Sequence, residues 1–508
     1  MTDHECLVLA LDMGTSGVKA AVVDSSGRVS LVAERRQVTL SNGPGWREHV
    51  PARTLRAALA SLREAAAGHD RADRICSISV TGSSGSFLML DPADRPTTNI
   101  ITWQDRRTAG AEPIPGFDLR RYREITGTTM DPSVALSRLL WLREHRPEVT
   151  GPGARLATPQ GLVMMALGAP GISIEPSVAA LVGLLDLESR DWSAELLERF
   201  DLESRILPPV IPSGSVVGQL GRRAAERLGL RPGIDLVLAA TDGVCAQLGA
   251  GVVEEGQVYG YLGSALAVSG PIRRPLRDPD GHLTTAPGFG PGWWRLVGLG
   301  MAGASAIDWF ARASGRPILR DVELALESTR PGSAGVLFLP SLAGAAAPSW
   351  DVHARGAFLG LTFSTSRQDL VRTVLEGVAL ELRAMFEAIR TAGIDASGLR
   401  LTGGGTRSLG WCRIVASAIH GEVSRVTEPH PGLRGAAFYA VAAHGADVRV
   451  ESVAGANPPA TGIIDRDPGA GRVYDELAET YLEARGALSR SSVDLRLARI
   501  AAEENTAQ

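Results

Sequence analysis

A small turn near the start of the chain has the residue types that can hold phosphate. In the segment LALDMGTSGVKAAVVD, Asp12 ends an apolar run, Gly14, Thr15 and Ser16 follow, and Lys19 is the only lysine among 52 basic residues. Glycine lets backbone N–H groups approach phosphate oxygens, hydroxyls add donors, and lysine supplies a compact charge. A carboxylate beside such a turn can hold Mg²⁺. An ordinary hairpin with an aspartate in its turn is the alternative interpretation.

Two familiar nucleotide-binding motifs do not fit this turn. A P-loop needs G-x-x-x-x-G-K-[ST] leading into a helix, whereas Lys19 is followed by alanine and a strand-like run. A Rossmann fingerprint needs G-x-G-x-x-G before a helix, and the GTSG sequence lacks it. The pattern therefore predicts a hairpin whose turn presents hydroxyl and amide groups.

Three other stretches carry residues suited to chemistry. In LAATDGV, Asp242 follows an apolar strand and precedes a small-residue helix, where it could act as a general base or simply cap the helix. Trp103 and Asp105, in ITWQDRRT, offer an aromatic face and a carboxylate that suit a sugar, although a surface aromatic beside charged residues is the alternative. The glycine run at 403–405 could lie against a nucleotide or form a plain loop.

The elements that must position these residues alternate along the chain. Short aliphatic runs predict strands at residues 6–14, 18–24, 75–82, 86–91, 235–243, 257–264 and 399–405. Longer amphipathic runs predict helices at residues 51–68, 137–145, 367–393 and 411–421. This order indicates an α/β architecture. Two halves with a similar strand, small turn, strand opening meet near residue 245, and the polar end 501–508 is expected to be loose.

Composition limits the class of protein. The 508 residues are 44% hydrophobic and 21% charged with a net charge of −4, as in a globular protein of two or more domains. The replacement of lysine by arginine is general to the chain, so the arginines do not indicate a nucleic-acid partner, and the mildly acidic total agrees. No apolar run approaches the roughly 20 residues needed to cross a bilayer.

The four cysteines are far apart in the sequence. Cys6, Cys76, Cys245 and Cys412 form no C-x-x-C pair, so we expect neither a disulfide framework nor a zinc knuckle, and a reducing compartment. The N-terminal segment lacks a basic n-region, and Asp12 interrupts its apolar run. These features predict a cytoplasmic enzyme or binding protein with no membrane partner.

Several stretches, in chain order, resemble the FGGY family of carbohydrate kinases, especially its xylulokinase-like and glycerol kinase-like members. LDMGTSGVKA is similar to the family's first phosphate loop, GWREHVP to its GW-x-E-x-x-P segment and WQDRRT to its W-x-D-x-R element. ITGTTMDPSVALSRLLWLREHRPEV is similar to a family signature, with Arg138 where lysine is usual. LTGGGTRSLGWCRIVASAIHGEV is similar to the adenine-binding stretch. The resemblance covers nearly the whole chain.

The resemblance implies two ribonuclease H-like α/β domains of the actin, sugar kinase and Hsp70 type, with the active site in a cleft between them. We expect residues 1–245 to bind sugar and phosphate, residues 246–490 to bind the nucleotide, and residues 491–508 to form a polar tail. The implied cofactors are ATP and Mg²⁺. The implied reaction is transfer of the γ-phosphoryl group to a primary hydroxyl of a ketose or polyol, with homodimerisation as a family expectation.

The resemblance also implies a role for each matching residue. Asp242 matches the general base, and Asp12 matches the residue that positions Mg²⁺. The phosphate-binding residues would be Gly14, Thr15, Ser16, Lys19, Gly263 and Ser264. The nucleotide would be bordered by Gly303, Gly404, Gly405, Thr406 and Ser408. The substrate would contact Ser84, Gly85, Trp103, Asp105 and Asp242.

Departures from the family pattern limit the identification of the substrate. Small residues at 83–86 stand where xylulokinases usually have Q-M-H-G and glycerol kinases an Arg-Glu pair. Ala345 and Ala346 replace a charged pair, whereas Trp103 and Asp105 are retained. These changes predict a roomier pocket with fewer polar anchors. We expect an acyclic ketose or polyol of about four to six carbons with a free primary hydroxyl.

Two other classes of function remain open from the sequence. A catalytically inactive nucleotide-binding regulator would keep the phosphate turns and lose the base, and Asp242 argues against it. A kinase of the same fold acting on a non-standard small carbonyl compound or polyol is the second alternative, because the altered residues are those that would face the sugar.

Overall fold

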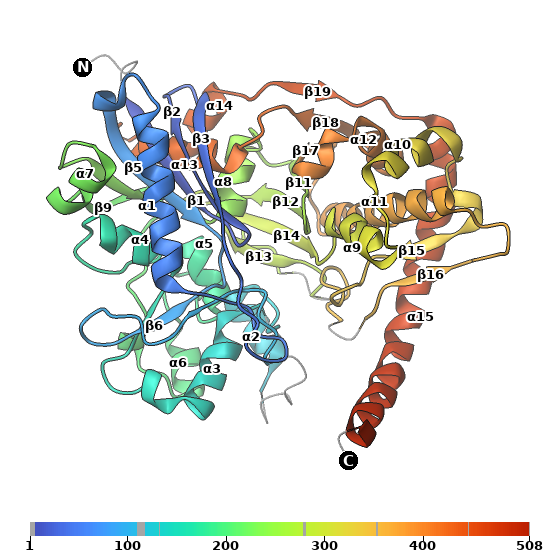
Figure 1. Cartoon of the computed structure of the whole chain (residues 1–508), viewed down its shortest axis with the longest axis horizontal. Coiled ribbons are helices and arrows are strands. Elements are labelled where there is room, and N and C mark those ends of the chain that lie inside the picture. The colour runs from blue at the N-terminus through green and yellow to red at the C-terminus, as the bar shows by residue number, and fades with distance from the viewer. Residues whose placement is uncertain are drawn as a thin grey trace.

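The computed structural model describes residues 6–108, 117–131, 133–277, 281–351, 354–445 and 447–506. Within them the chain forms two α/β halves, each built around a mixed sheet (Figure 1). Every segment predicted as a strand contains a strand, and each of the four predicted helices is present. No helix among these residues is long and apolar enough to span a membrane.

The first sheet has six strands in the order β3-β2-β1-β5-β10-β9. The strands are β1 (Leu7–Met13), β2 (Gly17–Val23), β3 (Val29–Arg36), β5 (Ile75–Gly82), β9 (Ser215–Gln219) and β10 (Asp235–Leu238). β1 pairs with β2 in an antiparallel hairpin and with β5 in parallel, and β5 pairs with β10 in parallel. The carboxyl ends of the three parallel strands therefore meet at one edge.

The second sheet repeats this plan with seven strands in the order β13-β14-β12-β11-β17-β18-β19. The strands are β11 (Gln257–Leu262), β12 (Leu266–Ile272), β13 (Thr284–Pro287), β14 (Trp294–Gly300), β17 (Gly398–Thr402), β18 (Glu422–Val426) and β19 (Thr461–Ile463). β11 and β12 form the hairpin, and β11, β17 and β18 run parallel. The similarity of the two halves expected from the sequence is thus present in both sheets.

Short strands and helices complete the two halves. The helices of the first half are α1 (Pro51–Ala67), α2 (Leu119–Thr126), α3 (Ala135–His145), α4 (Pro159–Leu167), α5 (Pro176–Ala179), α6 (Ala194–Arg199), α7 (Arg222–Leu228) and α8 (Asp242–Gly249). Those that follow are α9 (Ser305–Ala313), α10 (Leu319–Ser328), α11 (Arg367–Thr391), α12 (Leu409–Ala418), α13 (Pro431–Ala443), α14 (Val450–Ala456) and α15 (Pro468–Thr506). The short strands are β4 (Glu48–His49), β6 (Leu88–Leu90), β7 (Ile100–Ile101), β8 (Arg155–Ala157), β15 (Leu337–Leu339) and β16 (Ala357–Leu359). The segment expected to be loose after residue 500 is helical up to Thr506.

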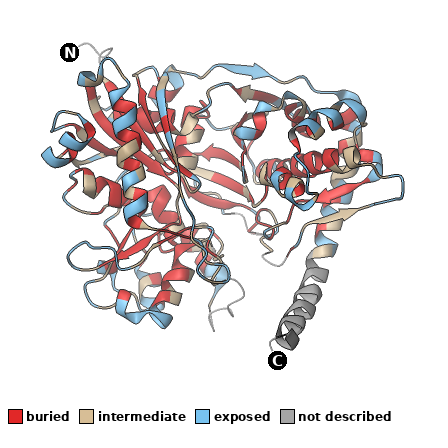
Figure 2. Cartoon of the chain, in the orientation of Figure 1, coloured by how far each residue is buried: buried red, intermediate tan, exposed pale blue. Residues whose placement is uncertain are grey.

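The central strands are apolar almost throughout because both of their faces are covered (Figure 2). In β1, Leu9 and Leu11 pack in the cluster formed with α1, whereas Val8 and Ala10 pack in the cluster formed with α8 and α13. Successive residues of a strand point to opposite faces, so β1 is fully apolar until Asp12 at its carboxyl end.

The chain returns to the first sheet after residue 430. Helix α13 packs on α8 and on β1, and Ser79 Oγ of β5 donates to the Ala436 carbonyl at 2.6 Å. Close approach of α8 and α13 depends on two glycines, because a Cβ at Gly249 would lie 1.9 Å from Pro431 O and one at Gly435 would lie 1.8 Å from Cys245 O. The start of α13 is thereby held near Asp12, whose Oδ2 lies 3.5 Å from the position of a Cβ at Gly432.

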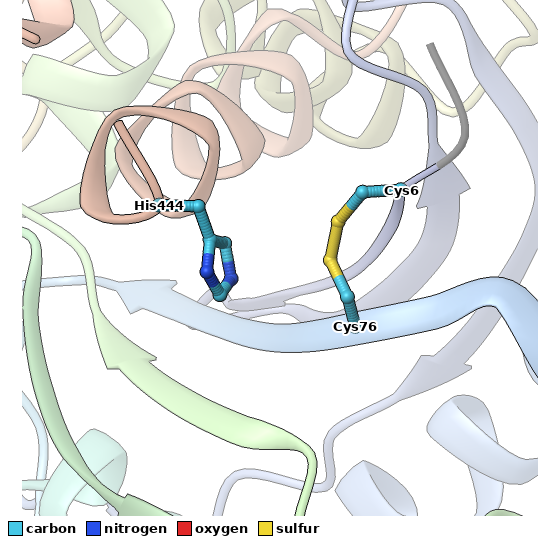
Figure 3. Close-up of side chains that lie close together, drawn as sticks. All are labelled: Cys6, Cys76 and His444. Carbon is cyan, nitrogen blue, oxygen red and sulfur yellow. A yellow bond between two sulfur atoms is a disulfide. The ribbon is translucent and has the colours of Figure 1, made fainter. Parts of the chain in front are cut away.

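The cysteine spacing indicated no disulfide framework, and the structure corrects this expectation for one pair. Cys6 and Cys76 form a disulfide, with their Cα atoms 5.7 Å apart (Figure 3). β1 and β5 are neighbours with Leu7 opposite Ile75, so this register brings together two residues that are 70 positions apart in the sequence. The sulfur atoms and a ring nitrogen of His444 lie within 4.8 Å of one another, and a disulfide leaves no thiolate for a metal. Cys245 and Cys412 are free and buried.

Candidate active site

The predicted phosphate turn links β1 and β2. In the hairpin register Asp12 is opposite Lys19, whose Nζ lies 3.7 Å from Glu34 Oε1 on β3. Gln37 fixes the turn from the side, since its Nε2 donates to the Gly14 carbonyl at 2.8 Å and its Oε1 accepts from Thr54 Oγ1 at 2.7 Å. Nothing in the sequence indicated this role for Gln37, because it follows a strand in an unremarkable polar context.

Asp12, beside the turn, has an unsatisfied carboxylate oxygen. Its Oδ1 is buried and has no hydrogen-bond partner among the described residues. Burial and the nearby charge of Asp242 raise its pKa to about 7, and Lys19 opposes that shift. This carboxylate oxygen lacks a hydrogen-bond donor and lies where negative charge is unfavourable. It is therefore suited to act as a ligand of a cation such as Mg²⁺.

Asp242 lies at the start of α8, directly after β10. Its Oδ1 accepts from Thr241 Oγ1 at 3.1 Å and from the Gly243 amide at 2.7 Å. Burial raises its pKa, and Arg295 opposes the rise. Thr81 Oγ1 donates to the Ala240 carbonyl at 2.6 Å, which ties the end of β10 to the strand beside β1. The two aspartates singled out from the sequence are thus brought to the same edge of the first sheet.

Two residues of the second sheet reach toward this edge. Tyr261 of β11, whose ring lies against Gly263, has its pKa raised by burial and by the charges of Asp242 and Asp12. Arg295 of β14 places Nη1 3.1 Å from the position that a Cβ at Gly243 would occupy. The sequence did not indicate either residue, because its proximity depends on how the two halves pack.

The substrate-binding residues expected from the sequence separate into two groups. Trp103 Nε1 donates to Thr15 Oγ1 at 2.8 Å, and the backbone amide of Trp103 donates to Ser86 Oγ at 3.1 Å. Trp103 and the segment containing Ser84 and Gly85 therefore lie beside the phosphate turn.

Asp105 is fully buried instead. Its carboxylate accepts from the Arg47 amide at 2.6 Å and from Arg107 Nε and Nη2 at 2.8 and 2.9 Å. Arg107 also pairs with Glu48 at 2.6 Å and lies 3.8 Å from the ring centroid of Trp46. The acceptor positions of Asp105 are thus used within the protein, which makes it a residue that positions the Trp103 segment.

Arg138, noted from the sequence only as a departure from lysine, joins the loops around the expected substrate site. Its side chain is fully buried and donates to the carbonyls of Gly85 and Ser133, each at 2.7 Å, and to that of Thr102. Burial lowers its pKa to about 9. The planar guanidinium can serve three carbonyls at once, whereas lysine offers a single centre.

Glycine turns gather at the carboxyl ends of β11 and β17. Gly303 abuts Gly263 so closely that a Cβ would lie 2.3 Å from the Gly263 carbonyl oxygen, and the Gly303 amide donates to Ser264 O at 2.9 Å. Gly403, with φ of 98°, abuts Leu262. Gly404 faces open space, because no described atom lies within 4 Å of the position that a Cβ would occupy there.

The other residues of the glycine-rich segment stabilise its shape. Gly405 packs on Leu262, Thr406 Oγ1 donates to the Gly403 carbonyl at 2.7 Å, and Ser408 caps α12 by accepting from the Trp411 amide. The predicted second phosphate turn and the predicted nucleotide segment are therefore neighbours in space. Backbone without side chains at the carboxyl ends of parallel strands suits a nucleotide.

Comparison with known proteins agrees with this geometry. Residues 7–249 match the N-terminal domain, and residues 258–444 the C-terminal domain, of the FGGY family of carbohydrate kinases. The chain belongs to this family. It is therefore a phosphotransferase with a carbohydrate kinase fold, and the two α/β domains of actin-like type expected from the sequence are confirmed.

Relatives of this kinase carry different names. A glycerol kinase from Gloeobacter violaceus is 31% identical over 85% of this chain and 87% of its own length. A xylulose kinase from Escherichia coli is 27% identical over 81% and 84%, and a gluconokinase from Bacillus subtilis is 27% identical over 82% and 83%. The crystal structure of a xylulose kinase from Brucella ovis superposes with a TM-score of 0.84 at 27% identity, covering 95% of this chain and 99% of that one.

Proposed function

We propose that this kinase transfers the γ-phosphoryl group of MgATP to a primary hydroxyl of a ketose or polyol, in the manner of a xylulokinase-like enzyme. The observation that carries the proposal is the pair Asp12 and Asp242. These carboxylates lie at the same edge of the first sheet as the phosphate turn, close enough for the charge of Asp242 to raise the pKa of Asp12. One of them has a buried oxygen without a donor, and the other is held by two hydrogen bonds.

The two carboxylates would have different tasks. Asp242 would accept the proton of the attacking hydroxyl, and its raised pKa makes it a better base than a solvated aspartate. Asp12 would hold Mg²⁺, which supplies charge neutralisation at the phosphates when bound. Because a like charge nearby raises the pKa of Asp12, cation binding would relieve that repulsion and keep both groups ionised.

The phosphoryl group would be held by donors from both halves. The Gly14 to Ser16 turn and Lys19 would approach it from the first half, and Gly263 with Ser264 from the second. A loose transition state spreads negative charge over the equatorial oxygens, so donors fixed by Gln37 and by the Gly303 contact would stabilise it. The turns at residues 403–408 would border the nucleotide, which would place ATP between the two sheets.

An ADP-release assay with MgATP and a panel of ketoses, aldoses and polyols tests this proposal. We expect release that depends on the acceptor and on Mg²⁺. A nucleotide-binding regulator would bind MgATP without acceptor-dependent release, and that result would contradict the proposal. The departures at residues 83–86 leave the acceptor itself to be found by the panel, since relatives named for glycerol, xylulose and gluconate have similar identities.

A further inference from the structure

Arg295 is a half-buried arginine for which the part of the chain that the structure describes supplies no acceptor. Its Nε atom is buried and donates to no acceptor, and no ion pair involves its guanidinium. The Nε atoms of Arg138 and Arg485 also lack an acceptor, but the terminal nitrogens of those arginines are paired: Arg485 Nη1 lies 2.9 Å from Glu381, and Arg138 donates to three carbonyls. A guanidinium nitrogen shielded from water without an acceptor is unfavourable, so an acceptor supplied from outside the chain would stabilise Arg295.

The side chain lies at the start of α8. Register places Arg295 opposite Pro271, two residues from Ser269 on the same face of the sheet, and Ser269 Oγ donates to Gln247 Oε1 of α8 at 2.8 Å. That face therefore abuts α8. Gly243 leaves the space into which Arg295 Nη1 extends, 3.1 Å from the position of a Cβ there. A cation at the positive end of a helix is unfavourable unless an anion joins it.

Asp242 does not fill that role. It is close enough for Arg295 to lower its pKa, yet the two groups form no ion pair, and Asp242 Oδ1 is held by Thr241 and Gly243. Arg295 Nη1 instead lies beside Gly243, the residue that follows the proposed base, so an anion bound by it would lie next to Asp242.

We propose that Arg295 binds a carboxylate of the substrate, so that the preferred acceptor is a polyhydroxy acid with a terminal primary hydroxyl. The inference rests on the proposed phosphoryl transfer to a primary hydroxyl, and it replaces the neutral ketose or polyol by an acid as the preferred acceptor. The guanidinium fork matches a carboxylate with two parallel hydrogen bonds. The small residues at 83–86, which the sequence places on the sugar-facing side, carry no charge that would repel a carboxylate.

The test compares acids with polyols of the same chain length. Gluconate is paired with sorbitol, xylonate with xylitol and erythronate with erythritol in the ADP-release assay. We expect kcat/KM to favour the acid of at least one pair by about tenfold or more. Arg295→Met should raise KM for that acid by about 100-fold, with a smaller change in kcat, because a buried charge pair is lost. Arg295→Lys should recover part of the loss.

Two controls separate binding from folding. Arg273→Met removes an exposed arginine that stacks on Trp293 at 3.4 Å and should leave the acid preference unchanged. Titration calorimetry of the preferred acid without nucleotide should show binding by the wild type that Arg295→Met loses, while the thermal midpoints of the two proteins stay similar.

Equal or better turnover of the polyols, with Arg295→Met affecting both members of a pair alike, would overturn the role of Arg295 and leave the proposed function standing. An effect of Arg295→Met on KM for ATP alone would also overturn it, because the arginine would then serve the nucleotide. Absence of ADP release with every acceptor would overturn the proposed function itself.

Discussion

Trp103 Nε1 donates a hydrogen bond to Thr15 Oγ1 at 2.8 Å. This contact joins the turn expected to hold the phosphoryl group to the segment expected to contact the acceptor. The two stretches are 88 residues apart in the sequence. This connection can hold the phosphoryl group and the acceptor hydroxyl in a fixed relative position. Positioning of the two reactants accounts for much of the catalysis of phosphoryl transfer.

Loss of this hydrogen bond should affect both substrates. Trp103→Phe keeps an aromatic ring and removes the donor, so we expect KM for ATP and for the acceptor to rise by about three- to tenfold, as for one neutral hydrogen bond of about 1 kcal/mol. Steady-state kinetics with each substrate varied will measure this. The matched control is Trp192→Phe, which loses a 2.8 Å bond to the Pro208 carbonyl away from the site and should change neither KM.

The glycine turn offers two substitutions with different outcomes. Gly403→Ala places a Cβ 2.6 Å from the Leu262 carbonyl oxygen at φ of 98°, so it should lower the thermal midpoint and weaken nucleotide binding together. Gly404→Ala meets no described protein atom within 4 Å, so it should weaken ADP binding while the midpoint stays within about 2 °C. Calorimetry and thermal unfolding will separate the two. Unchanged ADP affinity in Gly404→Ala would place the nucleotide elsewhere.

The raised pKa of Asp12 predicts that the contribution of this group to the stability of the ligand-free protein is smaller at neutral than at acidic pH. With a folded pKa of about 7 and an ordinary aspartate value of 3.8, the folded state binds this proton more tightly than the unfolded state. The stabilisation is complete below the lower value and is lost as the pH rises through the higher one. This group should lower the free energy of unfolding by up to about 1.4 kcal/mol per pH unit in that window.

Asp12→Asn removes the titrating group and should flatten this dependence. Denaturant unfolding of both proteins in the absence of metal and nucleotide, between about pH 5 and pH 8, will measure the difference in slope. Identical slopes would mean that the pKa of Asp12 is not raised in the folded protein.

The disulfide predicts the number of reactive thiols. Denatured but unreduced protein should alkylate at two cysteines, Cys245 and Cys412, and at all four after reduction, as mass spectrometry will show. Replacing both Cys6 and Cys76 by serine should lower the free energy of unfolding by about 2–4 kcal/mol. Four alkylated thiols before reduction would contradict the cross-link.

Local sequence patterns were sufficient to predict much of the fold and of the candidate site. The apolar run ending at Asp12 and the glycine-rich turn after it predict the β1–β2 hairpin because alternation and turn chemistry are local properties. The same holds for Asp242 after β10 and for the glycines after β17.

The features that the sequence did not indicate depend on contacts between distant segments. Arg295 reaches Gly243 through the packing of the second sheet on α8, and α13 contacts the first sheet through Ser79 and Ala436, which are 357 residues apart. Cys6 and Cys76 meet only because β1 and β5 pair in parallel. Asp105 matched a sugar-binding pattern by residue type, but its carboxylate is used by Arg107, and that pairing depends on the local folding of the loop.

The most direct test of the central claim is the turnover of Asp242→Asn together with its affinity for MgATP. Asparagine keeps an acceptor for the Gly243 amide and removes the base. We expect turnover to fall by about 10²- to 10⁴-fold while the Kd for MgATP, measured by calorimetry, changes less than about threefold. Asp12→Asn should instead weaken MgATP binding. Turnover of Asp242→Asn within about tenfold of the wild type would contradict Asp242 as the base.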